Sequence, residues 1–459
     1  MFKLSFFLII SFSSISFFLN TISEDLEKII ENSLKTEVLD IWYPLCIDKE
    51  YGGYLCDFSC DWKEDGSHDK MIVTQSRHLW TLSEAALYYK DKNYSKWAVH
   101  GYQFLKEKMW DSKYGGFYER LNREGKVKNE GAKSAYGNAF AIYGLSSYYR
   151  LIGDTSALNL AKKTFHWLEQ YNHDPEFKGY YNYLNRDGSL PASSGFLPPD
   201  QKDQNSSIHL LEAFTNLYQI WPNSLLHERL QELLILISDT IVTDKDYLTL
   251  FMQRDWTPIS LIDVPESQFK RMYYFDHVSF GHDIETAFLM LEAFHTLNHQ
   301  LDQSILIKAK RMVDHALYNG WDNVNYGFFD GGYYFKNSDT CTVINNKKIW
   351  WVQAEGLNAL LLMSKLFPDQ DRYFNLFKKQ WHYIDTYMID HEYGGWYGEG
   401  IDHSPDYIHS KKGYDWKANY HNFRALLNSI KMLRGEFELF NELDNETDGP
   451  NMPSIKKED

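Results

Sequence analysis

Positive charge is scarce in this sequence. Its 47 Lys and Arg residues stand against 63 Asp and Glu residues, which gives a net charge of −16 over 459 residues. A protein that binds nucleic acid needs a basic surface to displace counterions from phosphates, and anionic membranes attract basic proteins in the same way. The charge balance therefore argues against nucleic acids and anionic membrane surfaces as main partners.

Cysteine is rarer still. The four cysteines are Cys46, Cys56, Cys60 and Cys341. They are too few for the disulfide framework of a small secreted domain. Cys56 and Cys60 could pair in an oxidising compartment, and the sequence leaves this open. Their C-x3-C spacing is weak support for zinc, because neither a second cysteine pair nor a histidine cluster accompanies it.

Long apolar runs are absent except at the amino terminus. The apolar stretch 4–19 follows a single lysine, and Thr21 and Ser23 occupy positions −3 and −1 of a cleavage pattern before Glu24. The run is short for a membrane-spanning helix. We therefore expect residues 1–23 to be a cleaved signal peptide and the protein to be exported, either periplasmic or secreted. An uncleaved membrane anchor is the alternative; after cleavage we expect no membrane contact.

Aromatic residues, in contrast, are abundant. The sequence has 14 Trp, 33 Tyr and 29 Phe, together 17% of the chain. Aromatic rings stack on the C–H faces of sugars, which favours a carbohydrate ligand. The alternative is that these large side chains simply fill a core.

The chain repeats itself at a nearly regular interval. Turns that combine an aromatic residue with glycine lie at Tyr51, Tyr114, Gly179, Tyr326 and Tyr393. They are almost evenly spaced, except that the interval from Gly179 to Tyr326 is close to twice the others. Between the turns are stretches with apolar residues at i, i+3, i+4 and i+7, the helical pattern. A period of this length indicates a repeated unit larger than one helix.

Six helical stretches begin with a polar or aromatic cluster and continue as apolar sequence. Aligned at one equivalent position, they follow one another at similar intervals. The aligned residues are Arg77, Tyr136, His209, His282, Trp351 and His421. Six helix pairs predict an all-α fold, an (α/α)6 barrel of six inner and six outer helices with short β-turn or hairpin connections. The amino-terminal turns of the inner helices would then line one cleft.

The barrel accounts for one domain. We assign residues 24–439 to a single catalytic domain. Residues 440–459 are rich in Asn, Asp, Glu and Pro, and we expect them to form a disordered acidic tail.

The polar clusters contain three histidines at corresponding positions. His282 and Glu285 are three residues apart, as are His209 and Glu212, so each pair shares one face of a helix. His421 begins the last inner helix. A carboxylate beside an imidazole fixes its tautomer and raises its pKa, which prepares it for proton transfer. A single histidine is most often structural, but three at equivalent helix ends predict a shared site.

Two other uses of these residues stay open. The H-x-x-E spacing resembles the ligand pair of di-iron bundles, yet no H-E-x-x-H motif or Asp-rich loop accompanies it, so we expect no metal and no cofactor. Glu285, Glu355 and Asp283 are candidates for the carboxylate pair of a glycosidase. However, the histidines and Arg77 dominate the clusters and suit proton abstraction better than glycosyl cleavage.

These segments resemble the N-acylglucosamine 2-epimerase superfamily, and most of all its cellobiose 2-epimerase branch. The similarity extends from about Leu26 to Leu439. The motifs that carry it are Ser76-Arg-His-Leu-Trp80, Tyr136-Gly-Asn-Ala-Phe-Ala-Ile-Tyr143, Asn205-Ser-Ser-Ile-His-Leu-Leu-Glu-Ala213, Gly281-His-Asp-Ile-Glu285, Trp350-Trp-Val-Gln-Ala-Glu355 and Trp416-Lys-Ala-Asn-Tyr-His-Asn422.

The resemblance implies a role for each matching residue. His282 and His421 would be the two acid–base residues, with Glu285 supporting His282. Contacts to the reacting sugar would come from Arg77, Tyr136, Asn205 and His209. Further substrate contacts, mainly stacking, would come from Trp350, Trp351, Glu355 and Trp416.

Two features depart from the family pattern. Asn419 stands where the family often has proline before its last Tyr-His, which puts the loop that presents His421 in doubt. An export signal is unusual among these mostly cytoplasmic enzymes. It points to an external or periplasmic oligosaccharide as the substrate.

The expected reaction is inversion of C2 in the reducing-end aldose of a β-1,4-linked disaccharide, for example cellobiose to glucosyl-mannose. The ring opens, one histidine removes the C2 proton, a cis-enediolate forms, and a second histidine reprotonates the opposite face. The alternatives are an aldose–ketose isomerase or a monosaccharide 2-epimerase acting on mannose, fructose or N-acylglucosamine, and then an (α/α)6 glycoside hydrolase or a sugar-binding module. The sequence determines neither the preferred sugar nor whether the protein is a monomer or a dimer.

Overall fold

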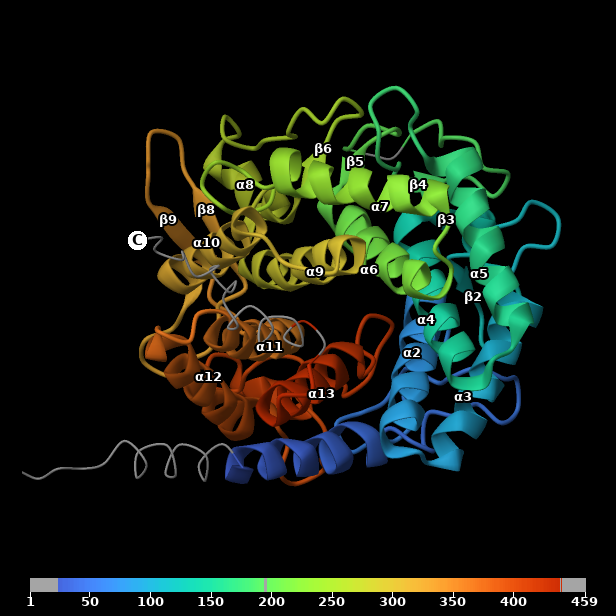
Figure 1. Cartoon of the computed structure of the whole chain (residues 1–459), viewed down its shortest axis with the longest axis horizontal. Helices are drawn as coiled ribbons and strands as arrows, with labels where there is room; N and C mark the ends of the chain where they lie inside the picture. Colours follow the sequence, from blue (N-terminus) through green and yellow to red (C-terminus); the bar gives the residue numbers. More distant parts are fainter. Residues whose placement is uncertain (1–23, 194–195, 438, 440–459) are drawn as a thin grey trace, which may run out of the picture.

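Six helices form an inner ring, which surrounds the centre of Figure 1. The structure, a computed structural model, describes residues 24–193, 196–437 and 439. The inner helices are α2 (Ile72–Tyr89), α4 (Ala135–Ile152), α6 (Gln204–Ile220), α9 (Phe280–Asn298), α11 (Trp350–Leu366) and α13 (Tyr420–Arg434). Most of their residues are buried, which explains why these helices are apolar nearly all round.

Outer helical segments surround this ring, and each packs on an inner helix. The first covers residues 24–33 and continues into the π-helical segment η1 (Leu34–Asp40). The others are α3 (Lys92–Phe104), α5 (Thr155–Trp167), α7 (Ser224–Leu236), α10 (Gln303–Gly320) and α12 (Asp371–Tyr383). Four of them end in a π-helical turn, namely η2 (Leu105–Met109), η4 (Leu168–Asn172), η5 (Ile237–Ile241) and η7 (Ile384–Met388).

The two ends of the described chain close the ring. Helix α13 contacts both α2 and η1. Near its end, the Arg434 guanidinium lies 2.5 Å from a Glu27 carboxylate oxygen and 2.7 Å from one of Glu31, both on the first outer segment. The fold is therefore the predicted all-α (α/α)6 barrel, held closed by contacts between residues that are far apart in the sequence.

Short antiparallel strands join the helix pairs, as the sequence predicts. The two-stranded sheets are β1 (Lys70–Met71) with β2 (Arg120–Leu121), β3 (Lys133–Ser134) with β4 (Tyr183–Leu184), and β5 (Lys202–Asp203) with β6 (Phe251–Met252). A three-stranded sheet contains β7 (Val278–Ser279), β8 (Gly331–Tyr334) and β9 (Cys341–Asn345), with α8 (Glu266–Met272) nearby in Figure 1. Strands β1, β3, β5 and β7 each lead directly into an inner helix.

A buried lysine–aspartate pair explains the recurring aromatic–glycine turns. In five connections, the turn follows an outer helix and its aspartate binds a lysine that precedes the next inner helix. The pairs are Lys70–Asp48, Lys133–Asp111, Lys202–Asp174, Lys348–Asp322 and Lys412–Asp390, at 2.5 to 3.2 Å. Each lysine also donates to a carbonyl oxygen of its turn. The turns thereby fix the entry of the inner helices into the ring.

The connection from α7 to α9 departs from this pattern. Val278 stands two residues before its inner helix, where four of the other connections have lysine, and the doubled interval between the turns at Gly179 and Tyr326 spans this connection. Here the Leu248 N–H donates to Oδ1 of Asp283 at 2.9 Å. Equivalent turn N–H groups donate to side-chain amides, those of Gln75, Asn138 and Gln353.

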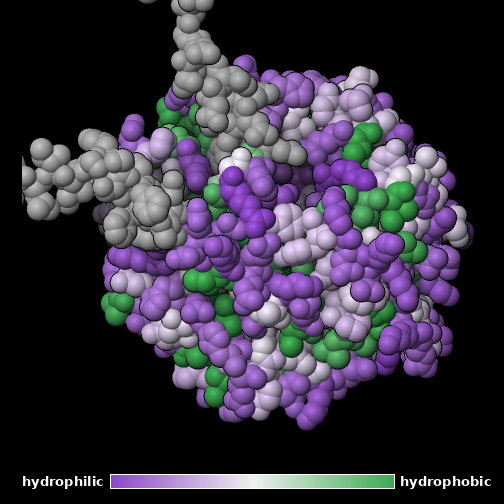
Figure 2. All heavy atoms as spheres, turned by 60° about the horizontal axis from the view of Figure 1, so that its bottom comes forward, coloured by the Kyte–Doolittle hydropathy of each residue, from purple (hydrophilic) through white to green (hydrophobic). Residues whose placement is uncertain are grey.

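Two sequence predictions lie beyond the described residues, namely the signal peptide over 1–23 and the tail over 440–459. In the part that is described, no helix has both the length and the apolar character needed to cross a bilayer. Cys56 and Cys60 are free thiols there. Figure 2 shows that hydrophilic side chains cover most of one face, with small, scattered apolar patches.

Candidate active site

The amino-terminal turns of the six inner helices converge on one cavity of about 260 Å³. Each helix contributes its aligned residue: Arg77, Tyr136, His209, His282, Trp351 and His421. The other lining residues are Asn205, Glu285, Ile349, Trp350, Tyr414 and Trp416. The structure therefore brings ten of the eleven predicted site residues to one space. The exception, Glu355, lies below the cavity.

A buried cluster of three carboxylates around one guanidinium forms the floor. Arg424 follows His421 by three residues on α13, and it binds Glu212 as well as Glu285 at 2.5 Å and Glu355 at 2.7 Å. These four side chains are at most 2% exposed. Because each carboxylate belongs to a different inner helix, Arg424 joins α6, α9 and α11 to α13. Glu355 belongs to this cluster and not, as the resemblance implied, to the substrate surface.

The cluster sets the protonation of its carboxyl groups. Burial opposes ionisation of Glu212, but Arg424 and His209 outweigh it and lower the pKa of Glu212 to about 2. Burial and the neighbouring Glu355 raise the pKa of Glu285 to about 7, against the attraction of Arg424. Burial also raises the pKa of Glu355. At neutral pH, Glu212 is therefore ionised while Glu285 titrates.

Two of the cavity histidines are paired with carboxylates. Nδ1 of His421 lies 2.6 Å from Oε1 of Glu355, and Nδ1 of His209 lies 2.8 Å from Oε2 of Glu212. A carboxylate acceptor holds the ring proton on Nδ1 and leaves Nε2 for the cavity. Burial, together with Arg77 and Arg424, holds the pKa of His421 well below its usual range. The His421 imidazole is therefore neutral at pH 7.

His282 has a different partner. The three-residue spacing predicts support from Glu285, but Nδ1 of His282 lies 2.8 Å from the hydroxyl of Ser279. Glu285 instead binds Arg424 and lies 3.7 Å from Nδ1 of His421. The expected pairing of Glu285 with His282 is wrong for this structure, because a guanidinium attracts a carboxylate more strongly than a neutral imidazole does.

One tryptophan lies against both expected acid–base histidines. The ring centroid of Trp351 is 4.7 Å from that of His282 and 5.7 Å from that of His421. Burial lowers the pKa of His282 to about 3, so this imidazole is also neutral at pH 7. Two neutral imidazoles thus face one cavity from α9 and α13, the helices on either side of α11. This arrangement suits proton transfer to and from a single bound molecule.

Arg77 supplies positive charge inside the cavity. Its guanidinium donates to the hydroxyl of Tyr136 at 2.8 Å and to the carbonyl oxygen of Trp416 at 3.3 Å. The Trp416 side chain, 48% exposed, stands at the rim with its ring centroid 6.1 Å from that of Tyr136. A guanidinium fixed beside the amino-terminal ends of helices favours negative charge on a bound molecule.

The loop that presents His421 is held by the unexpected Asn419. This buried side chain donates through Nδ2 to the carbonyl oxygen of Val38 at 3.3 Å. Its Oδ1 accepts a hydrogen bond from the hydroxyl of Tyr43 at 3.4 Å. Asn419 therefore ties the loop to the first outer segment.

The glycosidase candidates do not form a carboxylate pair at the cavity. Glu285 lines the cavity, whereas Glu355 lies in the floor and Asp283 accepts the Leu248 N–H away from it. Burial raises the pKa of Asp283 well above its usual range. The geometry thus gives no support to hydrolysis by two facing carboxylates.

Two groups of possible metal ligands in the described chain already enclose a basic side chain. Arg424 occupies the group of Glu285, Glu355 and His421. The ammonium of Lys348 lies 2.7 Å from carboxylate oxygens of both Asp322 and Asp402, which form the second group with His403. The carboxylates of both groups therefore already bind a cation that the protein itself supplies.

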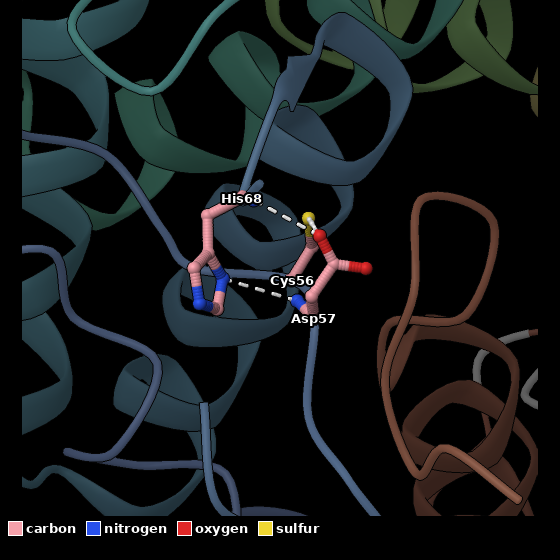
Figure 3. A group of neighbouring side chains, drawn as sticks. All are labelled: Cys56, Asp57 and His68. Atoms are coloured by element: carbon pink, nitrogen blue, oxygen red, sulfur yellow. Dashed lines mark hydrogen bonds between the residues drawn. The ribbon is translucent and has the colours of Figure 1, made fainter. Parts of the chain in front are cut away.

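The third group, Cys56, Asp57 and His68, is shown in Figure 3. Here Oδ2 of Asp57 accepts the backbone N–H of His68 at 2.9 Å, and Nδ1 of His68 accepts the backbone N–H of Asp57 at 3.2 Å. Burial raises the pKa of the Cys56 thiol, which keeps it protonated. These two hydrogen bonds join the chain at Asp57 to the chain at His68. The Cys56 thiol is in the protonated form, which binds metals poorly.

Sequence reasoning missed four residues of the site, namely Ser279, Ile349, Tyr414 and Arg424. A signal for Arg424 was present. On α6 and α9 the position three residues after the aligned histidine holds Glu212 and Glu285, and on α13 the same position holds Arg424. An arginine at a position otherwise occupied by carboxylates predicts an ion cluster between these helices.

Comparisons with known proteins agree with the resemblance. The model of the family described as N-acylglucosamine 2-epimerase matches residues 52–425. A cellobiose 2-epimerase of Ruminococcus albus is 31% identical over 408 residues, which are 87% of this chain and 97% of the relative. A D-mannose isomerase of Marinomonas mediterranea is 25% identical over 406 residues, 86% of this chain and 95% of the relative.

The solved structures agree as well. The structure of cellobiose 2-epimerase from Spirochaeta thermophila covers 91% of this chain and 98% of its own, with a TM-score of 0.77 and 27% identity. The match of the family model over most of the chain, the identity with the Ruminococcus albus relative and the shared barrel all point the same way. The chain therefore belongs to the N-acylglucosamine 2-epimerase family.

Proposed function

We propose that this enzyme inverts C2 of the reducing-end aldose of a β-1,4-linked disaccharide such as cellobiose. The observation that carries the proposal is the pair of neutral histidines, His282 and His421, that face one cavity from two helices. The relatives named cellobiose 2-epimerase support the choice of a disaccharide.

The reaction starts from the open-chain aldehyde, whose carbonyl acidifies the C2–H bond. A neutral histidine takes this proton on Nε2 and becomes an imidazolium, while the C–H electron pair moves into a cis-enediolate. Both imidazoles are neutral in the free protein, so the other histidine must first take up a proton from solvent. As the imidazolium it gives this proton to the opposite face of C2 and ends neutral. One proton is taken and one is returned, so the two histidines exchange protonation states in each turnover.

The enediolate intermediate needs positive charge where its oxygens lie. Arg77 is fixed at the cavity by Tyr136 and by the Trp416 carbonyl oxygen. The side-chain amide of Asn205 also lines the cavity, at the amino-terminal end of α6. Donors fixed in advance around a developing negative charge are usually the largest single contribution to catalysis.

The second sugar of the disaccharide would stack at the rim. Trp416 is the half-exposed aromatic side chain at the mouth, and Trp350 and Trp351 line the wall beside it. Aromatic walls with a few fixed polar groups are typical of small-molecule sites.

A second candidate is aldose–ketose isomerisation of a monosaccharide, which the relative named D-mannose isomerase favours. It shares the removal of the C2 proton and differs in the next step, because the proton returns to C1. The same cavity therefore supports both reactions, and the product distinguishes them.

The test is to incubate the protein in deuterated water with cellobiose and, separately, with mannose, and to follow products by proton NMR. We expect glucosyl-mannose with deuterium at C2. Fructose formed from mannose would move the assignment to the isomerase. If both sugars, and then β-mannobiose, come back unchanged and undeuterated, the epimerase proposal is wrong.

Variants test the two histidines directly. We expect His282→Gln and His421→Gln to abolish C2 exchange while largely retaining sugar binding, measured by calorimetry. His166→Gln is the matched control, because His166 is an exposed residue of the outer helix α5. Near-normal turnover in either cavity variant would exclude the two-histidine scheme.

We also propose that the chain is exported and cleaved before Glu24. The support is the charge and hydropathy pattern of residues 1–23. Amino-terminal sequencing of the mature protein would show a start at Glu24, whereas a membrane-bound protein with its first residues intact would indicate an anchor.

A further inference from the structure

Ser279 holds an unusual position at the start of α9. It is the N-cap residue of this helix, yet its side chain makes no capping hydrogen bond to the described backbone. Its hydroxyl oxygen instead lies 2.8 Å from Nδ1 of His282, three residues later. The Ser279 side chain is buried, and His282 is partly exposed to the cavity that it lines.

The equivalent residues of two other inner helices behave as ordinary caps. Ser134 precedes α4 and accepts the Gly137 N–H on its hydroxyl. Asp203 precedes α6 and accepts the Ser206 N–H. All three residues lie in the short strands that lead into these helices. Ser279 thus gives up the normal capping bond, which stabilises a helix, in favour of a bond to His282.

The partner also differs from those of the other cavity histidines. Nδ1 of His209 and Nδ1 of His421 each face a carboxylate oxygen. Nδ1 of His282 faces an uncharged hydroxyl. A hydroxyl can accept from Nδ1–H or donate to a bare Nδ1, and it lacks the strong bias toward imidazolium that a carboxylate exerts. Proton removal by Nε2 requires the first arrangement, in which the hydroxyl accepts.

We propose that Ser279 is a positioning residue that keeps the proton of neutral His282 on Nδ1 and directs Nε2 to the substrate. The inference rests on the proposed function for its catalytic consequence, but the tautomer itself is a property of the protein alone. Partners that orient a reactive imidazole in this way typically matter by about 10- to 100-fold when removed.

The direct test is nitrogen NMR of the protein labelled with ¹⁵N-histidine at pH 7, where two-bond correlations show which ring nitrogen carries the proton. The spectrum of His282→Gln identifies the His282 signals by their loss. We expect the wild-type ring to be protonated on Nδ1, and Ser279→Ala to give a mixture of both tautomers. A wild-type ring protonated mainly on Nε2, or a tautomer unchanged in Ser279→Ala, would overturn the proposal.

Two variants separate this role from simple helix capping. Ser134→Ala removes a hydroxyl at the equivalent position of α4 and should leave the His282 tautomer as in the wild type. Ser279→Thr keeps the hydroxyl and should restore the wild-type tautomer. If Ser134→Ala changes the His282 signals as much as Ser279→Ala does, the effect is structural and the proposal is wrong.

Kinetics give the catalytic consequence. We expect Ser279→Ala to lower kcat about 10- to 100-fold with KM within about twofold, because substrate contacts remain, and Ser279→Thr to recover most of kcat. A wild-type protein that leaves all the sugars unchanged would refute the proposed function while the NMR measurement still tests Ser279. An active wild type with full kcat in Ser279→Ala would refute the positioning role alone.

Discussion

Arg424 is the residue on which the floor of the cavity depends. One guanidinium binds carboxyl groups from three helices, and two of those groups also orient histidines. Removing one member of a buried ion cluster leaves uncompensated charge, which costs far more than the loss of an exposed pair.

We expect Arg424→Met to lower the free energy of unfolding by about 3–5 kcal/mol. Arg434→Met is the matched control on the same helix. Arg434 also binds two glutamates, but its side chain is 29% exposed, so we expect a loss below about 1 kcal/mol. Urea denaturation followed by fluorescence measures both. Equal losses in the two variants would show that the cluster contributes no more than a surface network.

The pKa of Glu285 predicts how the reaction depends on pH. Its pKa of about 7 means that the carboxyl is neutral below pH 7 and ionised above it. The ionised form, 3.7 Å from Nδ1 of His421, favours the imidazolium that one histidine must carry. Protonated Glu285 with neutral His421 holds the same number of protons as ionised Glu285 with the His421 imidazolium, so this active form is lost when the pair gives up its proton. We therefore expect kcat/KM to fall as the pH increases through about 7.

The measurement is kcat/KM between pH 5 and pH 9, which reports groups of the free enzyme. Glu285→Gln cannot ionise and should lack the change of slope near pH 7. Asp330→Asn is the control, since Asp330 is a partly buried carboxyl with a raised pKa of about 6 outside the cavity. A change of slope near pH 7 that persists in Glu285→Gln, or disappears in Asp330→Asn, would assign it to another group.

At the scale of elements, the recurring turn is the unit that builds the barrel. Its aspartate and the lysine before the next inner helix are buried in every copy. In three copies an arginine of the following hairpin also binds the aspartate, namely Arg123, Arg186 and Arg254. When the lysine is removed, an arginine therefore still binds the aspartate in these three copies.

This difference predicts unequal costs for one substitution. Lys412→Met leaves the buried Asp390 with backbone N–H groups and the Tyr397 side chain as partners but with no cation in the described chain, and we expect a loss of about 3–5 kcal/mol. Lys202→Met leaves Asp174 bound to Arg254 at 2.9 Å, and we expect about 1–3 kcal/mol. Thermal and urea denaturation of the two variants gives the comparison. A larger loss for Lys202→Met would contradict this account.

The element scale is also where sequence reasoning was most successful. The six aligned residues, from Arg77 to His421, all reached one cavity, because a polar cluster at the start of an apolar helix has one possible place in a closed ring. The same pattern does not say which side chain a polar group will bind. Glu285 bonds to Arg424, on another helix far along the chain, instead of His282 on its own helix. Such pairing depends on side-chain directions across the ring, which spacing along one helix does not contain.

Asp283 shows the same limit, here for a residue that lies away from the cavity. As a carboxylate next to His282 it is a reasonable site residue on sequence grounds. A step of one residue along a helix turns the side chain by about 100°, however, and Asp283 faces the Leu248 turn instead of the cavity. Asp283 holds the same position in its helix as Gln75 and Gln353 hold in theirs. Those two side chains accept a backbone N–H of a turn, and this equivalence predicts the same role for Asp283.

At the scale of the whole molecule, the barrel differs from an open array of repeats. In an open array each repeat contacts its neighbours in line, and a terminal repeat can be lost with only a partial loss of stability. Here α13 packs against α2, α11 and η1, so that the last unit is also the neighbour of the first. Removal of α13 would therefore take a packing partner from the inner helices on both sides of it, α11 and α2.

Ring closure predicts an all-or-none effect of truncation. A chain that ends after Asp369 lacks α12 and α13, which exposes apolar faces of α2, α11 and η1 and leaves the carboxylate cluster without Arg424. We expect it to show no cooperative thermal transition by circular dichroism. The control is a chain that ends after Leu439, which keeps α13 and the contacts of Arg434 with Glu27 and Glu31, and which should melt within a few degrees of the full chain. A cooperative transition in the shorter chain would mean that the remaining helix pairs form a stable open array, and that closure contributes little to the fold.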